Sequence, residues 1–244
     1  MMDPIELSKE TKEKVCRDKQ GKKERKYYRF RDTKFYGGIA TGDCVGCNLR
    51  CLFCWAWNKT NNPENSGTFK EPGEVSGKLI KIAEENNYDK VRISGNEPTI
   101  GKEHLLRVLT ELQETKLDFI LETNGLLLGE DIGYVEELSD FKNFLRARVS
   151  IKGCSPEQFS KLTQADSRGF KLQLNSLKNL LDYEIDCHPA VMISFSTSKE
   201  VNRLREKLAG INPYFVNFEP EKVKDYGGAM VRLNKAGIET KEDQ

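Results

Sequence analysis

Residues 42–55, GDCVGCNLRCLFCW, hold four of the seven cysteines of this 244-residue chain. Three of them have the spacing Cys47-x3-Cys51-x2-Cys54, and Cys44 lies three residues before the first. In a reducing compartment such a cluster is typical of metal ligation or redox chemistry rather than of disulfides. A zinc knuckle separates its two cysteine pairs by a dozen or more residues, whereas only three residues lie between Cys47 and Cys51. Three thiolates on one tight loop fit an iron–sulfur cluster better, and they leave one iron without a protein ligand.

The composition describes a globular chain without a charge bias. There are 39 basic and 38 acidic residues, so the net charge of +1 indicates no class of partner. The longest mainly apolar run, Ala190–Phe195, is far shorter than the roughly 20 residues that span a bilayer. The first residues also lack the apolar core of a signal peptide. We therefore expect no membrane partner and a cytoplasmic location. With only His104 and His188 present, schemes that need several imidazoles are excluded.

Strand-like and helix-like segments alternate from residue 35 onward. Stretches with helical spacing of apolar residues separate six β-like runs at 35–40, 90–94, 117–123, 145–151, 189–195 and 214–219. This alternation predicts parallel strands joined by outer helices. The expected fold is α/β, an incomplete (β/α)6 barrel over residues 35–222, with a doubly wound sheet as the alternative. In both folds the chemistry gathers at the carboxyl ends of the strands.

The two ends of the chain lie outside this pattern. Residues 9–34 contain 12 Lys and Arg against 5 Asp and Glu, with aromatic residues between them. We expect residues 1–34 to form a basic N-terminal arm. Residues 223–244 are polar and are expected to form a peripheral C-terminal tail.

The fourth predicted strand has one polar face. Leu145, Ala147, Val149 and Ile151 alternate with Arg146, Arg148, Ser150 and Lys152. A stripe with three cations directed into a barrel is costly unless an anion or solvent lies opposite it. The stripe therefore indicates an anion-binding site at the end of this strand.

Polar motifs follow the second, third and fourth predicted strands, and with the cysteine loop they resemble the radical S-adenosylmethionine (radical SAM) superfamily. Residues 94–98, SGNEP, are similar to the G-G-E-P motif of that family, with Asn96 in place of a glycine. Residues 122–125, ETNG, and 150–152, SIK, are similar to the D-T-N-G and D-x-K motifs of the small activating enzymes for glycyl-radical proteins. Phe53 stands where the family has an aromatic residue against the adenine of SAM.

The resemblance implies a site that joins these motifs. Three residues would hold a [4Fe–4S] cluster, namely Cys47, Cys51 and Cys54. Glu97 would receive the amino group of SAM, and Lys152 would bind its carboxylate. The full set of implied SAM contacts is Phe53, Gly95, Asn96, Glu97, Pro98, Glu122, Asn124, Ser150 and Lys152.

The implied activity is that of a radical SAM enzyme. A reduced cluster passes one electron to SAM, methionine is released, and a 5′-deoxyadenosyl radical abstracts hydrogen from a substrate. A one-electron reductant of the flavodoxin or ferredoxin type would supply the electron. The similarity to the small activating enzymes favours a protein or peptide substrate.

Other interpretations remain open from the sequence. The basic, aromatic-containing arm favours a nucleic-acid substrate such as tRNA as the alternative. A non-enzymatic zinc-binding module is a remote one. Cys44 is either a spare thiol or an alternate ligand, and Cys154 is either a small residue before a helix or a thiol near the site.

Overall fold

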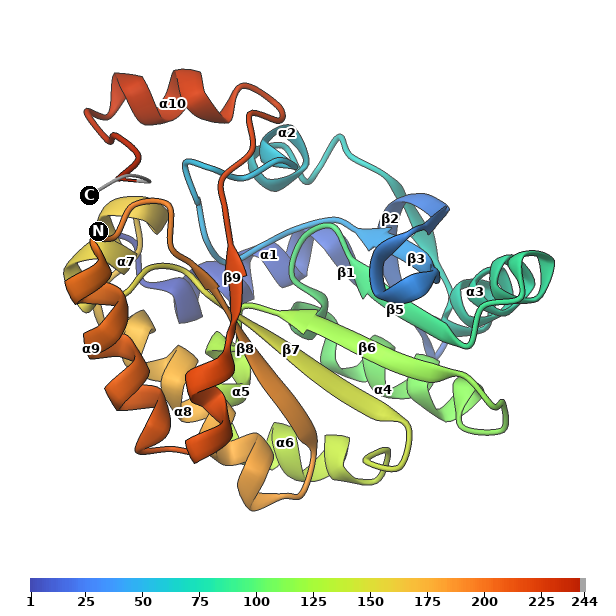
Figure 1. Ribbon diagram of the computed structural model, residues 1–244. Helices are drawn as coiled ribbons and strands as arrows, with labels where there is room; N and C mark the ends of the chain where they lie inside the picture. Colours follow the sequence, from blue (N-terminus) through green and yellow to red (C-terminus); the bar gives the residue numbers. More distant parts are fainter. Residues whose placement is uncertain (242–244) are drawn as a thin grey trace.

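The computed structural model describes residues 1–241 and contains one open, twisted sheet with helices on its outer face (Figure 1). The strand order is β1-β2-β3-β5-β6-β7-β8-β9, and β4 pairs with β2. Six consecutive strands of this order are parallel: β3 (Ile39–Cys44), β5 (Lys90–Ser94), β6 (Asp118–Thr123), β7 (Leu145–Ile151), β8 (Asp186–Met192) and β9 (Glu219–Glu221). The predicted incomplete (β/α)6 barrel is confirmed, and the sheet does not close.

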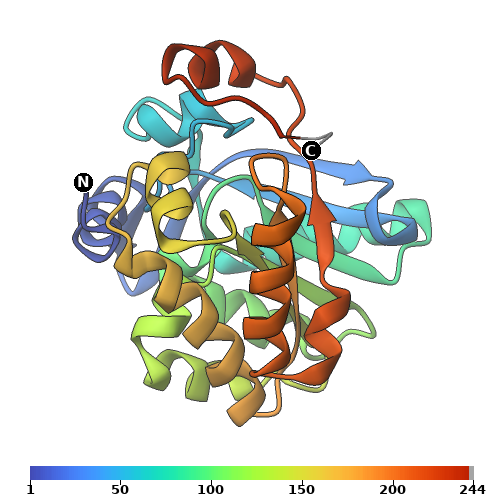
Figure 2. The ribbon, with the colours of Figure 1, turned by 60° about the vertical axis from the view of Figure 1, so that its left-hand side comes forward.

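Helices cover the convex face of the sheet, and their apolar stripes form the core with it. Val75, Leu79 and Ala83 of α3, for example, are completely buried. Figure 2 shows the gold to orange helices of the C-terminal half stacked against this face. The main covering helices are α3 (Pro72–Asn86), α4 (Lys102–Leu112), α5 (Leu126–Glu130), α6 (Ile132–Ser139), α7 (Pro156–Thr163), α8 (Arg168–Asp182) and α9 (Ser198–Ala209). No helix in residues 1–241 has the length and apolarity that crossing a bilayer requires.

Residues 1–34 do not form a separate arm, so that prediction is wrong. They form α1 (Pro4–Val15), β1 (Cys16–Lys19) and β2 (Lys22–Thr33), and β2 pairs antiparallel with β3. Many of the cations in this segment are engaged by the protein. Arg29 and Arg31 contact Asp43, while Lys26 donates to two main-chain carbonyls. The positive charge that suggested a nucleic-acid partner is therefore largely neutralised or buried.

The first and last predicted strands are displaced toward the C-terminus. Residues 35–37 form a 3₁₀ turn, η1 (Phe35–Gly37), because Tyr36, Gly37 and Gly38 have φ of 56°, 82° and 130°, which no strand accommodates. β3 therefore begins at Ile39 rather than at residue 35. Residues 213–217 likewise form η3 (Pro213–Asn217), and only the short β9 follows.

The predicted peripheral tail packs against the cysteine loop. α10 (Ala229–Lys235) buries Ala229 and Leu233 completely, and it lies beside α2 (Trp57–Asn61) in both ribbon views (Figures 1 and 2). Arg232 donates to the carbonyls of Leu52 and Cys54 at 2.9 and 2.7 Å. Residues 223–241 are thus part of the site's support, and 242–244 lie outside the described residues. The remaining elements are β4 (Thr68–Lys70) and η2 (Pro98–Gly101).

One buried cation joins β2 to two loops at the carboxyl edge of the sheet. The Arg25 side chain, in a residue only 1% exposed, donates to the carbonyls of Val45, Glu97 and Pro98 at 3.2, 2.6 and 2.8 Å. These carbonyls hold the buried guanidinium through Nη1 and Nη2, and the guanidinium in turn holds their loops, while its Nε has no hydrogen-bond partner among residues 1–241. The N-terminal strand therefore fixes the position of the cysteine loop.

Replacing Arg25 by methionine tests this connection. Arg25→Met removes the side-chain donor from three buried carbonyl oxygens, and an unsatisfied buried group costs about 1–3 kcal/mol, so we expect the free energy of unfolding in urea to fall by about 3 kcal/mol. The matched control is Arg168→Met, because the Arg168 side chain is 74% exposed. The control should change stability by less than about 0.5 kcal/mol, and equal losses in both variants would contradict the role of Arg25.

His104 of α4 makes the stability of this region depend on pH. Its Nδ1 donates to the Lys23 carbonyl at 2.7 Å, and its Nε2 accepts from the Tyr27 hydroxyl at 3.1 Å. Burial lowers the pKa of His104 from 6.5 to about 4. The unfolded chain therefore binds a proton at a higher pH than the folded chain does.

We expect stability from neutral His104 to be complete above pH 6.5 and to be lost as the pH falls toward 4, by about 3 kcal/mol in total. Urea unfolding of the wild type and of His104→Asn between pH 4 and 7 measures this loss as the difference between the two proteins. A difference that is constant over this range would show that His104 does not titrate there.

Candidate functional site

The cysteine loop follows β3 and is held in place from several sides. The amides of Arg50 and Leu52 donate to the carbonyls of Thr163 and Leu162 in α7 at 3.1 and 2.9 Å. Gly46 has φ of 93°, and a Cβ there would lie 2.7 Å from Thr11 of α1. The loop backbone is therefore held by α7 and α1.

The three cysteines of the C-x3-C-x2-C motif are suited to a cluster rather than to one ion. Burial raises the pKa of the Cys47 thiol and raises that of Cys51 to about 12, so bound metal is needed to keep both as thiolates. In the part of the chain that the structure describes, no three Cys, His, Asp or Glu side chains converge to hold a single metal ion. The C-x3-C-x2-C spacing places three thiols on one loop and fits a [4Fe–4S] cluster, whose irons bind separate thiolates.

The structure separates the other two candidate cysteines from this role. Cys44 is completely buried on β3, and the Arg25 guanidinium lies 3.5 Å from its sulfur. Cys154 is buried at the start of α7, where its amide donates to Gln158 at 2.6 Å. Both cysteines therefore fit the interpretation in which the thiol packs in the protein interior and does not bind the cluster.

The loop after β5 carries the second motif. Gly95 has φ of 92°, and a Cβ there would lie 3.0 Å from both Asp43 Cβ and the Tyr28 hydroxyl, so glycine is required. Asn96 does not have positive φ, so its backbone has no need of the family's glycine. The Asn96 side chain instead accepts from the Gly46 amide at 2.9 Å and donates to Thr60 at 2.7 Å. It joins the second motif to the cysteine loop and to α2.

Glu97 is buried, and protein donors occupy its carboxylate. Oε1 accepts from the Thr99 amide at 3.2 Å and from the Thr99 and Thr123 hydroxyls at 2.7 Å, while Oε2 accepts from the Asn124 amide at 2.7 Å. Oε1 is thus fully used, whereas Oε2 accepts only one bond and keeps an acceptor position for a further donor. The contact of Glu97 with the amino group of SAM stays a prediction, and its protein partners add a positioning role in which Glu97 joins the ends of β5 and β6. Pro98 follows it at the start of η2.

Asn124, at the end of β6, reaches the cysteine loop. Its Nδ2 donates to Asn48 Oδ1 at 2.8 Å and lies 3.8 Å from the Cys47 sulfur. Gln173 of α8, which is completely buried, donates to the carbonyls of Asn124 and Ser150, both at 2.7 Å. Gln173 was not among the predicted site residues, although a polar residue on the apolar face of an amphipathic helix is a signal for such a contact.

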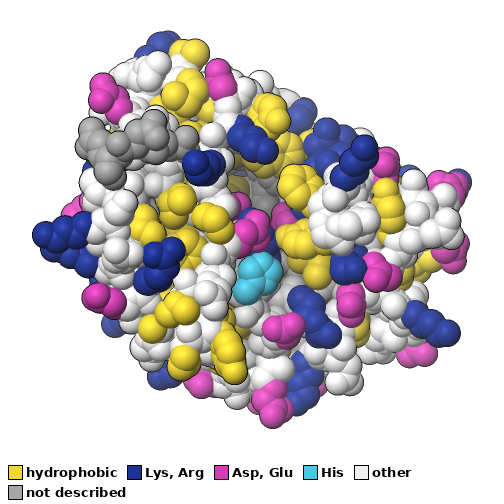
Figure 3. All heavy atoms as spheres, in the orientation of Figure 1, with side chains coloured by type: hydrophobic (Ala, Val, Ile, Leu, Met, Phe, Trp, Pro, Cys, Tyr) yellow, Lys and Arg dark blue, Asp and Glu magenta, His cyan; other side chains and the backbone are white. Residues whose placement is uncertain are grey.

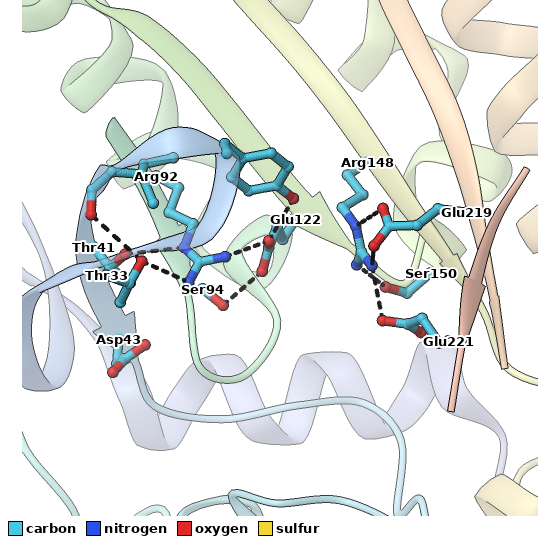
Figure 4. Close-up of polar contacts among 12 residues, drawn as sticks. Thr33, Thr41, Asp43, Arg92, Ser94, Glu122, Arg148, Ser150, Glu219 and Glu221 are labelled. Carbon is cyan, nitrogen blue, oxygen red and sulfur yellow. Dashed lines mark hydrogen bonds and ion pairs between the residues drawn. The ribbon is translucent and has the colours of Figure 1, made fainter. Parts of the chain in front are cut away.

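Glu122 belongs to a polar cluster on the concave face of the sheet (Figure 4). Its carboxylate accepts from Arg92 at 2.5 Å, from Ser94 at 2.8 Å and from the Tyr36 hydroxyl at 2.9 Å. The pKa of Tyr36 is raised by burial and by the nearby Glu122. The η1 turn therefore closes over the end of β6 and places a phenol there.

The polar stripe of β7 meets carboxylates of β9 in a second cluster (Figure 4). Arg148 donates to Glu219 at 2.8 Å and to Glu221 at 2.9 Å, and Lys152 lies 3.7 Å from Glu221. The hydrogen bond from Arg148 lowers the pKa of Glu219 despite the partial burial of this carboxyl. The anion expected opposite the stripe is thus supplied by the protein. The alternating Glu219-Pro-Glu221 pattern was the available sequence signal.

The two clusters lie on the concave face, which is hollowed at its centre. Figure 3 shows acidic side chains in this hollow and hydrophobic and basic side chains around its rim. Phe53 packs near Phe195, with ring centroids 5.8 Å apart, and Lys152 Nζ lies 5.8 Å from the Phe53 ring. Ser150 contacts Arg148 at 3.3 Å. The cysteine loop, Phe53 and both clusters therefore meet at one end of the sheet.

The sequence profile of the Radical SAM superfamily matches residues 43–208, more than half of the chain. The chain belongs to the radical SAM superfamily. Enzymes of this superfamily use a [4Fe–4S] cluster and SAM, and these are the cofactors of this chain. The chain is therefore a radical SAM enzyme, and the alternative of a non-enzymatic zinc-binding module is rejected.

Related sequences include GTP 3′,8-cyclases. The probable GTP 3′,8-cyclase of Methanococcus maripaludis (strain C5) is 32% identical over 118 residues, which cover 48% of this chain and 37% of that protein. The GTP 3′,8-cyclase of Aquifex aeolicus is 29% identical over 157 residues, 57% of this chain and 47% of that protein. This chain thus spans less than half the length of these relatives.

Solved structures share the fold. SuiB of Streptococcus suis bound to SAM has a TM-score of 0.60 at 18% identity, over 78% of this chain and 44% of that chain. A mutant of spore photoproduct lyase has a TM-score of 0.55 at 12% identity, over 79% of this chain and 58% of that chain. At these identities the similarity shows the radical SAM fold alone.

The positioning role of Glu97 predicts the behaviour of Glu97→Gln. The amide nitrogen of glutamine cannot accept, so at least one buried donor loses its partner, and we expect the free energy of unfolding to fall by about 2 kcal/mol. Less iron should also be bound after anaerobic reconstitution, because the ends of β5 and β6 support the cysteine loop. Urea unfolding and iron analysis measure both effects.

The control is Glu137→Gln, whose parent side chain is 54% exposed. Stability and iron content of this variant should match the wild type. If Glu97→Gln also matches the wild type in both measurements, the Glu97 carboxylate does not support the loop.

Proposed function

We propose that this chain generates a 5′-deoxyadenosyl radical and uses it to abstract hydrogen from a small polar molecule in the hollow of the concave face. When bound, the cluster and SAM supply one-electron reductive cleavage of the sulfonium. The chain's own residues bind and orient both molecules. We assign Cys47, Cys51 and Cys54 to the cluster. The proposed SAM contacts are those that the sequence predicts, namely Phe53, Gly95, Asn96, Glu97, Pro98, Glu122, Asn124, Ser150 and Lys152.

The observation that carries this proposal is the pair of charged clusters on the concave face. Arg92 with Glu122, and Arg148 with Glu219 and Glu221, place charges at the carboxyl edge of the sheet, where solvent is partly excluded. Keeping ion pairs in such a place is no better for stability than apolar packing. A charged or strongly hydrogen-bonding substrate accounts for their presence, because it exchanges partners with them.

The names of the relatives support the same substrate class. They are GTP 3′,8-cyclases, and by their name they act on a nucleotide. Since this chain spans only part of those proteins, GTP is the first molecule to test rather than an assigned substrate.

The protein or peptide substrate expected from the sequence has weaker support. It depends on the motif similarities at residues 122–125 and 150–152, whose side chains Glu122 and Lys152 are engaged in the ion-pair clusters. A nucleic-acid substrate loses its main argument because the cations of residues 17–31 are largely paired or buried. We retain the expectation of a flavodoxin- or ferredoxin-type reductant in a reducing cytoplasm.

The decisive experiment measures 5′-deoxyadenosine with anaerobically reconstituted protein, SAM and dithionite. We expect a small polar molecule, with GTP tested first, to increase the rate of 5′-deoxyadenosine formation about tenfold or more, since substrate binding lowers the barrier by at least about 1.4 kcal/mol. Cys47→Ala is the negative control. Substrates deuterated at the reacting carbon should transfer deuterium to 5′-deoxyadenosine.

Parallel reactions contain synthetic peptides or bulk tRNA in place of the nucleotide. Stimulation by peptide or tRNA alone, with none from a broad panel of small polar molecules, would overturn the proposed substrate class. Absence of any SAM cleavage by the loaded protein would overturn the proposed activity.

A further inference from the structure

Thr60 lies beside one of the three motif cysteines. Its hydroxyl oxygen is 3.6 Å from the Cys54 sulfur, within hydrogen-bond range for sulfur. Thr60 is on the short helix α2 and is only 1% exposed, so water does not compete for the contact. The direction of this hydrogen bond depends on where the hydroxyl proton points.

Asn96 fixes the direction of the Thr60 hydroxyl. The Gly46 amide donates to Asn96 Oδ1 at 2.9 Å, which determines which end of the Asn96 amide is the oxygen. Nδ2 therefore faces Thr60 and donates to its oxygen at 2.7 Å. Because the Thr60 oxygen accepts this bond, its own proton is free to be donated elsewhere.

Two acceptors compete for the proton of Thr60. The Ala56 carbonyl lies 3.2 Å from the hydroxyl, but it already accepts from the amides of Lys59 and Thr60 at 2.9 and 3.0 Å. Cys54 bound to iron is a thiolate, which only accepts and carries negative charge. A hydrogen bond to an anionic acceptor is stronger than one to a shared carbonyl.

We propose that Asn96, Thr60 and Cys54 form a hydrogen-bond relay that raises the reduction potential of the cluster. The inference depends on Cys54 holding the cluster, as in the proposed function. Reduction adds negative charge to the cluster and its thiolates, so a hydrogen bond to a ligand sulfur stabilises the reduced state more than the oxidised state. Asn96 and Thr60 are thus positioning residues. The relay also explains why this chain has asparagine at position 96, where the family motif has glycine, because glycine could not orient Thr60.

The test is an EPR-monitored redox titration of the reconstituted cluster without SAM or substrate. At the potential that half-reduces the wild-type cluster, we expect Thr60→Val to decrease the ratio of reduced to oxidised cluster about tenfold, a shift of about 59 mV to lower potential. Valine has the shape of threonine without the hydroxyl. Thr60→Ser keeps the hydroxyl and should restore the wild-type potential.

The matched control is Thr110→Val, which removes a hydroxyl that is exposed on α4 and donates to the Leu106 carbonyl. Its titration should coincide with that of the wild type. Iron and sulfide contents of all variants are measured first, so that potentials are compared only between loaded proteins.

A second variant tests the relay if the Thr60→Val protein does not bind a cluster. Asn96→Gly restores the residue of the resembling motif and removes the donor that orients Thr60, so we expect a smaller shift in the same direction. In the double variant, Asn96→Gly should add nothing to Thr60→Val, because both act through one hydroxyl. Potentials that agree with the wild type in every loaded variant, or a shift that Thr60→Ser does not reverse, overturn the relay.

The result is separable from the proposed function because the titration needs no turnover. A shifted potential in a protein that acts on no small molecule keeps the relay and rejects the substrate class. If the variants keep the wild-type potential and the protein turns over GTP, the relay is rejected and the proposed substrate class is kept.

Discussion

Two buried charged side chains, those of Arg25 and Glu97, hold the candidate site together. The Arg25 side chain binds three carbonyls of the loops after β3 and β5, and the carboxylate of Glu97 binds four donors of η2 and β6. Each charge is expensive to bury and is stable only with these partners in place. Parallel strands bring the loops to the same edge, but this pair of charges sets how the loops lie relative to one another. The position of the cysteine loop therefore depends on both side chains.

Segments outside residues 43–208, the part that matches the superfamily profile, complete this support. β2 reaches the cysteine loop through Arg25, and α10 reaches it through Arg232, which binds two of its carbonyls. Guanidinium groups suit this work because they present several donors in a fixed plane. The radical SAM fold places the ends of the parallel strands together, and the flanking β2 and α10 of this chain bind the cysteine loop through Arg25 and Arg232.

Features that depend on local patterns were predictable from the sequence, and features that depend on distant partners were not. Periodicity located the central strands, and spacing selected Cys47, Cys51 and Cys54. Arg25 looked like part of a solvated arm, because its acceptors lie up to 73 residues away and are main-chain atoms without a sequence signature. For the same reason, Arg148 suggested an external anion, whereas Glu219 and Glu221 of the last strand neutralise it. The sequence predicts that Glu97 meets the amino group of SAM, whereas its four protein donors, on η2 and at the end of β6, have no sequence signature.

The most direct test of the account is EPR spectroscopy of the reduced, anaerobically reconstituted chain, recorded without and with SAM. We predict a [4Fe–4S] signal whose shape changes when SAM is added, because the three motif cysteines leave one iron open. The same change should persist in Cys44→Ala, since that thiol is buried against Arg25. Bound zinc without an iron signal would contradict the account. So would a cluster signal that SAM leaves unchanged and that Cys44→Ala abolishes.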